Sequence, residues 1–138
     1  MRYLIDSNIF LFSVLDNGRL TNGIKSVIRD YGNRVYLCHE SVKEVISLFH
    51  SGKIIFKQWK KAEDIIDFII NETGFEIKYV QEEHLRTLAN LPFFSDHRDP
   101  SDRIIIAQAI TEKIPLVSSD KKFFLYEDSG LEFIFNGR

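Results

Sequence analysis

Short runs of strand-forming residues alternate with helix-like segments along the whole chain, and this alternation restricts the fold more than any other feature. The strand-like runs are rich in Ile, Val, Leu, Tyr and Phe, and they cover residues 2–6, 34–38, 75–80, 115–119 and 131–135. Alternating strands and helices favour a mostly parallel sheet with helices on both faces. Ligands then bind beyond the carboxyl ends of the strands, where the strand order reverses. The residues that end each run are therefore the first candidates for chemistry.

The segments between these runs carry apolar residues at helical spacing. Four apolar faces are formed by Ile24, Val27, Ile28 and Tyr31, by Val42, Val45, Ile46 and Phe49, by Trp59, Ala62, Ile66 and Ile69, and by Leu85, Leu88 and Leu91. Gly52 follows the second face and fits a helix C-terminal cap. A fifth segment, residues 104–110, is apolar nearly all round, as expected of a helix that packs deep against a sheet.

The composition fits a single folded domain that spans residues 1–138. Hydrophobic residues make up 44% of the chain and include twelve Phe, which supplies a core that disordered chains lack. The single cysteine, Cys38, excludes an intramolecular disulfide and a Cys-based zinc site. No apolar run approaches the length of about 18 residues that a membrane span needs, and no charged leader precedes the first strand. We therefore expect a cytoplasmic protein without membrane association.

The balance of charge gives no global attraction to nucleic acid. The chain has 20 acidic and 18 basic residues, and its formal net charge is −2. Domains that bind nucleic acid usually carry a basic face or an overall positive charge. If RNA is the substrate, local positive charge and a bound cation must replace the missing bulk charge.

Five carboxylates stand at the edge of the sheet that this fold assigns to ligands. Asp6 and Asp120 stand at the ends of the first and fourth strand-like runs, and Glu44 falls in the first turn of the helix after the second run. Asp99 and Asp102 begin the apolar helix that leads to the fourth run. We expect these side chains to converge.

Such a cluster of carboxylates indicates a divalent cation. Two carboxylates about 4 Å apart repel by roughly 4 kcal/mol at an effective dielectric constant near 20, so the cluster is costly unless a cation lies among its members. Oxygen ligands favour Mg²⁺ or Mn²⁺ over zinc. Either ion can polarise a phosphodiester and lower the pKa of an attacking water, so the pattern predicts phosphate chemistry.

Each acid also has a structural interpretation. Residues 41–44 fit a capping box, in which Glu44 would satisfy a backbone N–H. Residues 99–102 fit an N-cap, a proline at the first helical position and an acid beside the positive end of the helix. Asp120 could begin a turn. The two uses are compatible, because a helix N-terminus can also hold a carboxylate in place.

Three segments, in the same order along the chain, carry a family resemblance. Residues 4–8 (LIDSN) are similar to the opening motif of the PIN domain, and residues 97–109 (HRDPSDRIIIAQA) resemble the signature of VapC-type toxins within that family. Residues 115–120 (PLVSSD) are similar to its last acidic motif, with Ser118 where Thr is common. Glu44 falls at the expected helix start. The small departure is Ser101, where these toxins often carry an aromatic residue.

The resemblance implies a fold and an activity. The fold is a three-layer α/β/α sandwich with a five-stranded parallel sheet, in which the first and fourth strands are neighbours. The activity is endoribonuclease cleavage of RNA with Mg²⁺ or Mn²⁺. The acids that match the family motifs, Asp6, Glu44, Asp102 and Asp120, would form the catalytic set. Asp6 and Asp102 would bind the metal directly, and Glu44 and Asp120 would hold metal-bound waters or help to activate the nucleophile.

The resemblance also implies partners: an RNA substrate, a separate VapB-like antitoxin and a second copy in a homodimer. Two other functions compete with this interpretation. A catalytically inactive PIN-like module would bind RNA or protein, but no acid of the set is missing. A phosphotransfer domain is disfavoured because Asn8 stands where a haloacid-dehalogenase-type phosphatase needs Asp, and because no Asp ends the runs 34–38 or 75–80, as a receiver domain requires.

Further residues lie beside the motifs. Ser7 and Asn8 could hydrogen-bond a carboxylate or the scissile phosphate, or cap the next helix. Ser118 lies two residues before Asp120, so in a strand both would point the same way, and Ser118 could orient a carboxylate or water.

The basic residues near the acids have two interpretations each. Arg103 is expected to form an ion pair with Asp99, or else to contact phosphate. Arg98 and residues 121–122, two lysines, could form a local positive rim. His97 is the histidine nearest a motif and could touch the substrate.

Overall fold

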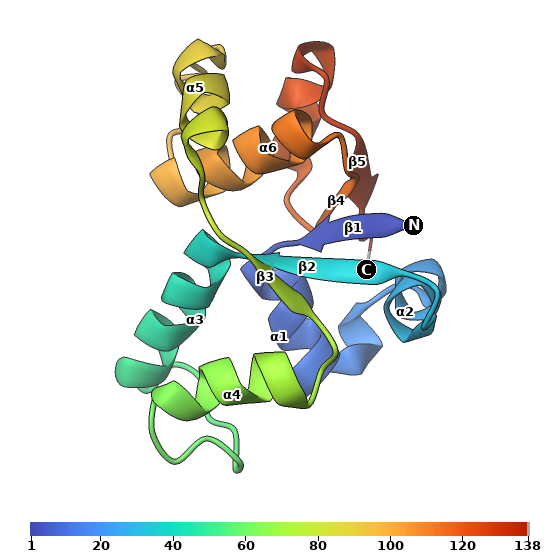
Figure 1. Ribbon diagram of the computed structural model, residues 1–138, viewed down its shortest axis with the longest axis vertical. Helices are drawn as coiled ribbons and strands as arrows, with labels where there is room; N and C mark the ends of the chain where they lie inside the picture. Colours follow the sequence, from blue (N-terminus) through green and yellow to red (C-terminus); the bar gives the residue numbers. More distant parts are fainter. Residues whose placement is uncertain (138) are drawn as a thin grey trace.

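A computed structural model describes residues 1–137 and contains a five-stranded, fully parallel sheet (Figure 1). The strands are β1 (Arg2–Ile5), β2 (Arg34–Cys38), β3 (Glu76–Lys78), β4 (Leu116–Ser118) and β5 (Phe133–Phe135). Their order across the sheet is β3-β2-β1-β4-β5, and each neighbouring pair is parallel. All five predicted strands are confirmed, with ends that differ from the prediction by two residues at most.

Helices cover both faces of the sheet and give the predicted three layers (Figure 1). On one face lie α1 (Ser7–Leu15), α2 (Asn22–Arg29), α3 (His39–His50) and α4 (Glu63–Asn71), with the short 3-10 turn η1 (Asn17–Arg19) after α1. On the other face lie α5 (Glu82–Asn90), α6 (Pro100–Glu112) and the 3-10 segment η2 (Lys121–Ser129). The fold is therefore the α/β/α sandwich expected from the sequence.

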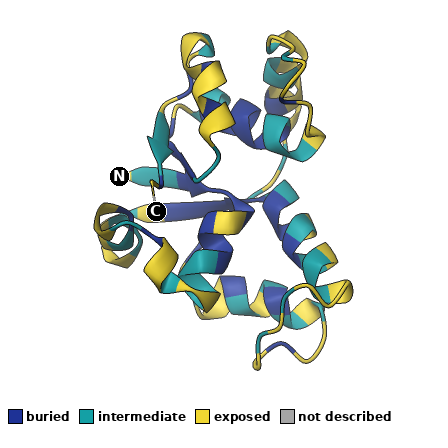
Figure 2. Ribbon diagram, turned by 180° about the vertical axis from the view of Figure 1, so that it is seen from behind, coloured by how far each residue is buried: buried dark blue, intermediate teal, exposed yellow. Residues whose placement is uncertain are grey.

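Successive residues of the central strands point to opposite faces and divide the core in two. Ile5 and Val117 pack with the layer of α1 to α4. Their neighbours Leu4 and Leu116 pack under α6 and η2. Figure 2 shows the result: most of the central strands β1, β2 and β4 and the inward sides of the helices are buried, and exposed positions lie mainly on the outside. Among residues 1–137, no helix is both long enough and apolar enough to cross a membrane.

The order in which successive strands are added across the sheet reverses beside β1. From β1 the chain passes through the first layer to β2 and β3, and then crosses back over the other face through α5 and α6 to β4. β1 and β4 are paired in register, with Leu4 opposite Leu116 and Ile5 opposite Val117. The carboxyl ends of β1 and β4 thus flank the switch point, where this class of fold binds its ligands.

Local sequence fixes the start of α6 and the end of α3. Asp99 is the N-cap of α6, and Pro100 occupies its first position, as predicted. The predicted stop after α3 is also confirmed, because Gly52 has a φ of 76° that glycine adopts without strain. The backbone N–H groups of Gly52 and Lys53 bond to the carbonyls of Phe49 and Leu48, which closes the helix end.

Three predicted apolar faces are partly wrong. Tyr31 lies beyond the end of α2 and is fully exposed, and Leu85 is 52% exposed on α5, whose buried residue is His84. Trp59 is buried, but it precedes α4, which begins only at Glu63.

Helix α1 was not among the predicted segments. Residues 7–15 (SNIFLFSVL) are apolar on nearly every side, so they show no helical period. The structure gives the reason: α1 follows β1 directly and is covered both by the sheet and by neighbouring helices, with Ile9 and Phe10 fully buried.

Candidate active site

Four structural elements bring the predicted acids to one edge of the sheet. Asp6 follows β1, and Asp120 lies two residues beyond the end of β4. Asp102 lies in the first turn of α6, and Glu44 lies in α3. The carboxyl of Asp102 is close enough to Asp6, Glu44 and Asp120 for their charges to raise its pKa. The acids therefore form one cluster at the switch point between β1 and β4.

Asp6 is held in place at the start of α1. Its side chain is the N-cap of that helix, and Oδ1 accepts a hydrogen bond from the backbone N–H of Ile9 at 3.0 Å. The hydroxyl of Ser118 lies close enough to this carboxylate to lower its pKa. Burial is nevertheless the largest influence and, with the charges of Glu44 and Asp120, raises the pKa of Asp6 to about 6.

Asp102 is the most strongly perturbed acid of the cluster. Its side chain retains 26% of its exposure, so the carboxyl is partly open to solvent. Burial, followed by the charges of four neighbouring carboxylates of which Asp99 acts most strongly, raises the pKa of Asp102 to about 7. The cluster thus concentrates more negative charge than its surroundings can stabilise.

Ser118 connects the two strand-end acids. Its hydroxyl lowers the pKa of Asp6, and its Oγ accepts a hydrogen bond from the backbone N–H of Asp120 at 3.0 Å. Asp120 begins η2, and its Oδ1 accepts from the backbone N–H of Lys122 at 2.9 Å. The expected proximity of Ser118 and Asp120 is therefore present, but strand alternation is not its cause, because β4 ends at Ser118.

The capping box predicted at residues 41–44 is absent. Helix α3 begins at His39 and has Cys38 as its N-cap, so Ser41 is buried inside the helix and Glu44 lies in its second turn instead of its first. The cause is that β2 runs directly into α3 without a connecting loop. Glu44 is consequently not needed as a cap and remains available to the cluster.

A shallow hollow of ≈ 310 Å³ lies beside the cluster, between α3 and the start of α6. Glu44, Asp99 and Ser101 line it, together with Glu40, which the sequence did not single out. Glu40 forms an ion pair with Lys43 at 3.1 Å. Because these groups surround an open hollow next to Asp102, a ligand bound there would reach the cluster from the α3 side.

Asp99 and Arg103 do not form the ion pair that we expected. Asp99 Oδ1 accepts from the backbone N–H groups of Ser101 and Asp102, at 2.9 and 3.3 Å, which confirms the helix-cap interpretation. Arg103 donates instead to the carbonyl of Pro92 at 2.9 Å and to Oη of Tyr126 at 3.1 Å. The carboxylate that would attract Arg103 is already used by the helix end.

Ser7 and Asn8 do not cap α1 either, because Asp6 fills that position. Both lie in the first turn, Ser7 buried and Asn8 exposed. Within residues 1–137, neither side chain hydrogen-bonds a carboxylate of the cluster.

His97 is closer to the acids than the sequence indicated. The side chain is buried, with 3% of its surface exposed, and Nε2 lies 3.4 Å from Oδ2 of Asp102. Ligand atoms of His97, Asp102 and Asp120 all lie within 4.8 Å of one another. Burial, the largest influence, lowers the pKa of His97. The sequence feature that pointed to a place for His97 in the site was its position two residues before Asp99, inside the segment that resembles the VapC signature.

Comparison with known proteins identifies the family. The family profile of the PIN domain matches residues 3–127, which include all the acids of the cluster. The chain is a PIN domain. Proteins of this family are typically metal-dependent nucleases that use Mg²⁺ or Mn²⁺. A search of the curated proteins finds no significant match.

Several solved structures share the fold of this PIN domain. VapBC2 from Rickettsia felis, bound to a DNA fragment from its promoter, is 15% identical with a TM-score of 0.70 over 98% of both chains. VapBC-1 from nontypeable Haemophilus influenzae is 14% identical with a TM-score of 0.68 over 100% of both chains. VapBC-5 from Mycobacterium tuberculosis, a member of the VapBC family of toxin–antitoxin systems, is 15% identical with a TM-score of 0.58 over 97% and 96% of the two chains. At these identities the likeness concerns the fold.

The residues of the cluster fit a divalent cation of the Mg²⁺ type. Its donors are carboxylate oxygens, which such hard cations prefer. The raised pKa values of Asp6 and Asp102 arise from burial and mutual repulsion, both of which a bound cation would offset. The PIN domain therefore carries a site whose charge is suited to the metal that its family uses.

A second group of metal-binding residue types does not fit a cation. Glu83, His84 and Glu112 lie together on α5 and α6. Nδ1 of His84 accepts from the backbone N–H of Gln81 at 2.9 Å, and Nε2 lies 3.1 Å from Glu112. Glu112 also binds Lys78 at 3.0 Å. Its charge is neutralised and the ring nitrogens are occupied, so this group stabilises the packing of α5 on α6.

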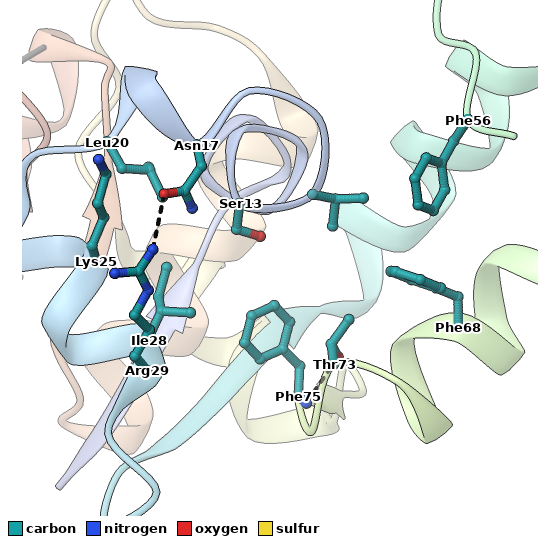
Figure 3. Close-up of a pocket in the computed structure, with 11 residues that line it drawn as sticks. Ser13, Asn17, Leu20, Lys25, Ile28, Arg29, Phe56, Phe68, Thr73 and Phe75 are labelled. Carbon is teal, nitrogen blue, oxygen red and sulfur yellow. Dashed lines mark hydrogen bonds between the residues drawn. The ribbon is translucent and has the colours of Figure 1, made fainter. Parts of the chain in front are cut away.

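Another hollow of the PIN domain is separate from the acids. It has a volume of ≈ 410 Å³ and lies among α1, α2 and α4, where Figure 3 shows Lys25 and Arg29 at one end, Phe56 and Phe68 at the other, and Phe75 between them. No carboxylate lines it, in contrast to the hollow beside Glu44. Its apolar and basic lining provides no ligands for a metal.

Proposed function

We propose that this PIN domain is a Mg²⁺- or Mn²⁺-dependent endoribonuclease and that it acts as the toxin of a VapBC-type toxin–antitoxin pair. One observation carries the proposal: burial and mutual repulsion raise the pKa of Asp6 to about 6 and that of Asp102 to about 7 at the switch point of the sheet. Ionising both groups without a counter-charge is unfavourable. A bound divalent cation would supply that counter-charge.

Asp6 and Asp102 are the proposed metal ligands. Asp6 is fixed by the N–H of Ile9, and Asp102 by its place in the first turn of α6. The ion, when bound, supplies polarisation of the phosphodiester and a lowered pKa for the attacking water. The protein contributes the rigid placement of two carboxylates on separate elements, which fixes where the phosphate can bind.

Glu44 and Asp120 are the proposed groups that orient and deprotonate the attacking water. Oδ1 of Asp120 already accepts from the N–H of Lys122, so the backbone uses part of the hydrogen-bonding capacity of this carboxylate. Lys43 pairs with Glu40 rather than with Glu44. The carboxylate of Glu44 is therefore the stronger candidate for accepting the proton of the attacking water.

Exposed basic residues beside the cluster are the proposed contacts to the RNA backbone. Arg98 precedes Asp99, and Lys121 and Lys122 follow Asp120, and all three are exposed. With a net charge of −2 the domain has no bulk attraction for RNA, so such local cations must bind the phosphates. Arg103 is not in this set, because its guanidinium bonds to Pro92 and Tyr126.

The toxin role rests on the likeness of fold to VapBC structures. By analogy we propose a VapB-like antitoxin as a separate chain, a homodimer of the PIN domain, and action in the cytoplasm. Expression of the domain alone should arrest growth of a bacterial host, and co-expression of a small DNA-binding protein encoded beside it should relieve that arrest. Growth arrest that Asp102→Asn leaves unchanged would contradict the toxin role.

RNA cleavage by the purified protein tests the proposed activity. The wild type should cleave RNA with Mg²⁺ or Mn²⁺, a chelator should abolish cleavage, and Asp6→Asn and Asp102→Asn should lose it. Asp67→Asn is the matched control, because Asp67 is an exposed aspartate on α4, in the other layer. Cleavage that survives both site variants would exclude the proposed site.

An inactive PIN-like module is the competing function. It is disfavoured because each predicted acid is present and faces the same cluster. An inactive module need not bind metal, so a protein that binds neither Mg²⁺ nor Mn²⁺ would favour this alternative.

A further inference from the structure

His97 is a buried polar side chain that the proposed chemistry does not use. Its Nε2 is enclosed by protein and has no hydrogen-bond partner, yet it lies 3.4 Å from Oδ2 of Asp102. The other ring nitrogen, Nδ1, lies 2.7 Å from Oη of Tyr126. A buried group of this kind calls for a functional explanation when its free atom faces a reactive carboxylate.

The contacts of Tyr126 fix which ring nitrogen of His97 carries the proton. Tyr126 is completely buried, and its Oη accepts a hydrogen bond from Arg103 at 3.1 Å. The phenol proton then needs an acceptor, and Nδ1 of His97 is the acceptor within reach. The proton of the neutral ring must therefore be on Nε2, the atom that faces Asp102.

We propose that His97 is a positioning residue for Asp102: Arg103 and Tyr126 hold the ring so that Nε2–H donates to Oδ2 and leaves the other carboxylate oxygen free for the cation. The inference rests on the proposed function, since it assumes that Asp102 binds the metal. Partners of this kind orient metal ligands in many proteins and strengthen metal binding. The short movement needed to close the 3.4 Å gap is within the range of a side-chain adjustment on ligand binding.

Packing around the ring supports a positioning role. The ring of His97 packs edge-on against Phe123 and Tyr126, with centroid distances of 5.6 and 5.3 Å. A hydrogen bond from Arg103 to the carbonyl of Pro92 anchors the loop that carries His97. The imidazole therefore has little freedom to turn away from Asp102.

Direct binding of the metal by His97 is the competing role, because its ligand atom lies near those of Asp102 and Asp120. That role needs a bare Nε2 and a proton on Nδ1. Oη of Tyr126 would then accept from both His97 and Arg103, and its own buried proton would have no partner. Unpaired buried donors are unfavourable, so the hydrogen-bond pattern favours the positioning role.

Two measurements on the full chain test the inference. Long-range ¹H–¹⁵N NMR spectra of the imidazoles should place the proton of His97 on Nε2, both without metal and with saturating Mg²⁺. Calorimetric titration with Mg²⁺ should show that His97→Leu weakens binding about tenfold, the lower end of the effect of removing such a partner. His97→Gln, which keeps an N–H near the Nε2 position, should restore most of the affinity.

The controls separate this inference from the proposed function. His50→Gln, an exposed histidine at the end of α3, should change nothing. Tyr126→Phe keeps the ring and removes the hydroxyl that fixes the proton of His97 on Nε2. This variant should therefore weaken Mg²⁺ binding and allow the proton to occupy either ring nitrogen. It tests the inference even if His97→Leu does not fold. A proton on Nδ1 of the wild type, or unchanged Mg²⁺ affinity in His97→Leu or Tyr126→Phe, would overturn the positioning role alone. A wild type that binds no Mg²⁺ would overturn both proposals.

Discussion

The hydroxyl of Ser118, at the end of β4, acts on the carboxylate of Asp6, which follows β1, across the switch point of the sheet and lowers its pKa. The same oxygen accepts a hydrogen bond from the backbone N–H of Asp120 at 3.0 Å. Ser118 therefore links two acids that lie near opposite ends of the sequence. The strand pairing of β1 with β4 creates this link, and the link stabilises the charged form of Asp6.

Replacing Ser118 by alanine tests that link. Ser118→Ala removes the hydroxyl that lowers the pKa of Asp6, so this pKa should rise above its value of about 6. Loss of a buried hydrogen bond should also lower the free energy of unfolding by about 1 kcal/mol. Carboxyl ¹³C NMR and urea denaturation measure the two effects. Ser118→Thr, which keeps the hydroxyl, should change the pKa little, and an unchanged pKa in Ser118→Ala would disprove the link.

In the metal-free protein, the contribution of Asp6 and Asp102 to stability should fall as the pH rises from about 4 to about 7. Asp6 and Asp102 have folded-state pKa values of about 6 and about 7, above the ordinary value of 3.8. Between these values the folded state binds more protons than the unfolded state, so their contribution to the free energy of unfolding falls as they ionise. The contribution is fully present below pH 3.8 and lost above pH 7.

Asp102→Asn isolates this effect from the titration of other groups. In the absence of metal it should be more stable than the wild type at pH 8, by about 1 to 2 kcal/mol after allowance for the partial exposure of Asp102. The difference should vanish near pH 4. Asp67→Asn, on an exposed face of α4, should show no such trend. Urea denaturation at several pH values provides the comparison, and a variant less stable than the wild type at pH 8 would argue against repulsion within the cluster.

A bound cation should reverse the repulsion and stabilise the fold. Mn²⁺ or Mg²⁺ binds the folded state preferentially, so it should raise the thermal midpoint, with a gain of about 2.7 kcal/mol at a concentration of 100 times the Kd. Asp6→Asn and Asp102→Asn should lose this gain, and Asp67→Asn should keep it. Thermal melts with and without metal decide the matter, since no shift at millimolar metal would contradict a functional cluster.

Asp99 should prove to be a helix cap more than a metal ligand. Asp99→Ala removes the cap of α6 and should lower the free energy of unfolding by about 1 kcal/mol. Asp99→Asn keeps the capping oxygen and removes the charge, so it should restore most of the stability and lower the pKa of Asp102, which Asp99 now raises. Urea denaturation and carboxyl NMR measure these effects. Complete loss of Mn²⁺ binding in Asp99→Asn would instead make Asp99 a ligand.

Features with a local sequence signal were predictable. The strands show as short β-rich runs, and the start of α6 shows in residues 99–102 because an N-cap and a proline act on their own backbone. A general rule on parallel sheets placed Asp6 and Asp120 on the same edge, and the pairing of β1 with β4, which brings them together, followed from the family resemblance.

Features that depend on tertiary contacts were not predictable. Helix α1 lacks an amphipathic period because it is covered on nearly all sides, and α3 begins earlier than expected because β2 leads straight into it. Arg103 and His97 both bind Tyr126, which follows them by 23 and 29 positions. No local pattern in the sequence identifies such a partner, so neither contact could be foreseen.

The central claim is that Asp6 and Asp102 share one cation, and calorimetric titration with Mn²⁺ at pH 6 tests it most directly. Because both carboxyls are partly protonated at that pH, metal binding must release protons, which is measured by comparing buffers of different ionisation enthalpy. We predict saturable binding with proton release at pH 6, little release at pH 8, and loss of binding in Asp102→Asn. Binding without proton release at pH 6, or binding that Asp102→Asn leaves intact, would contradict the account.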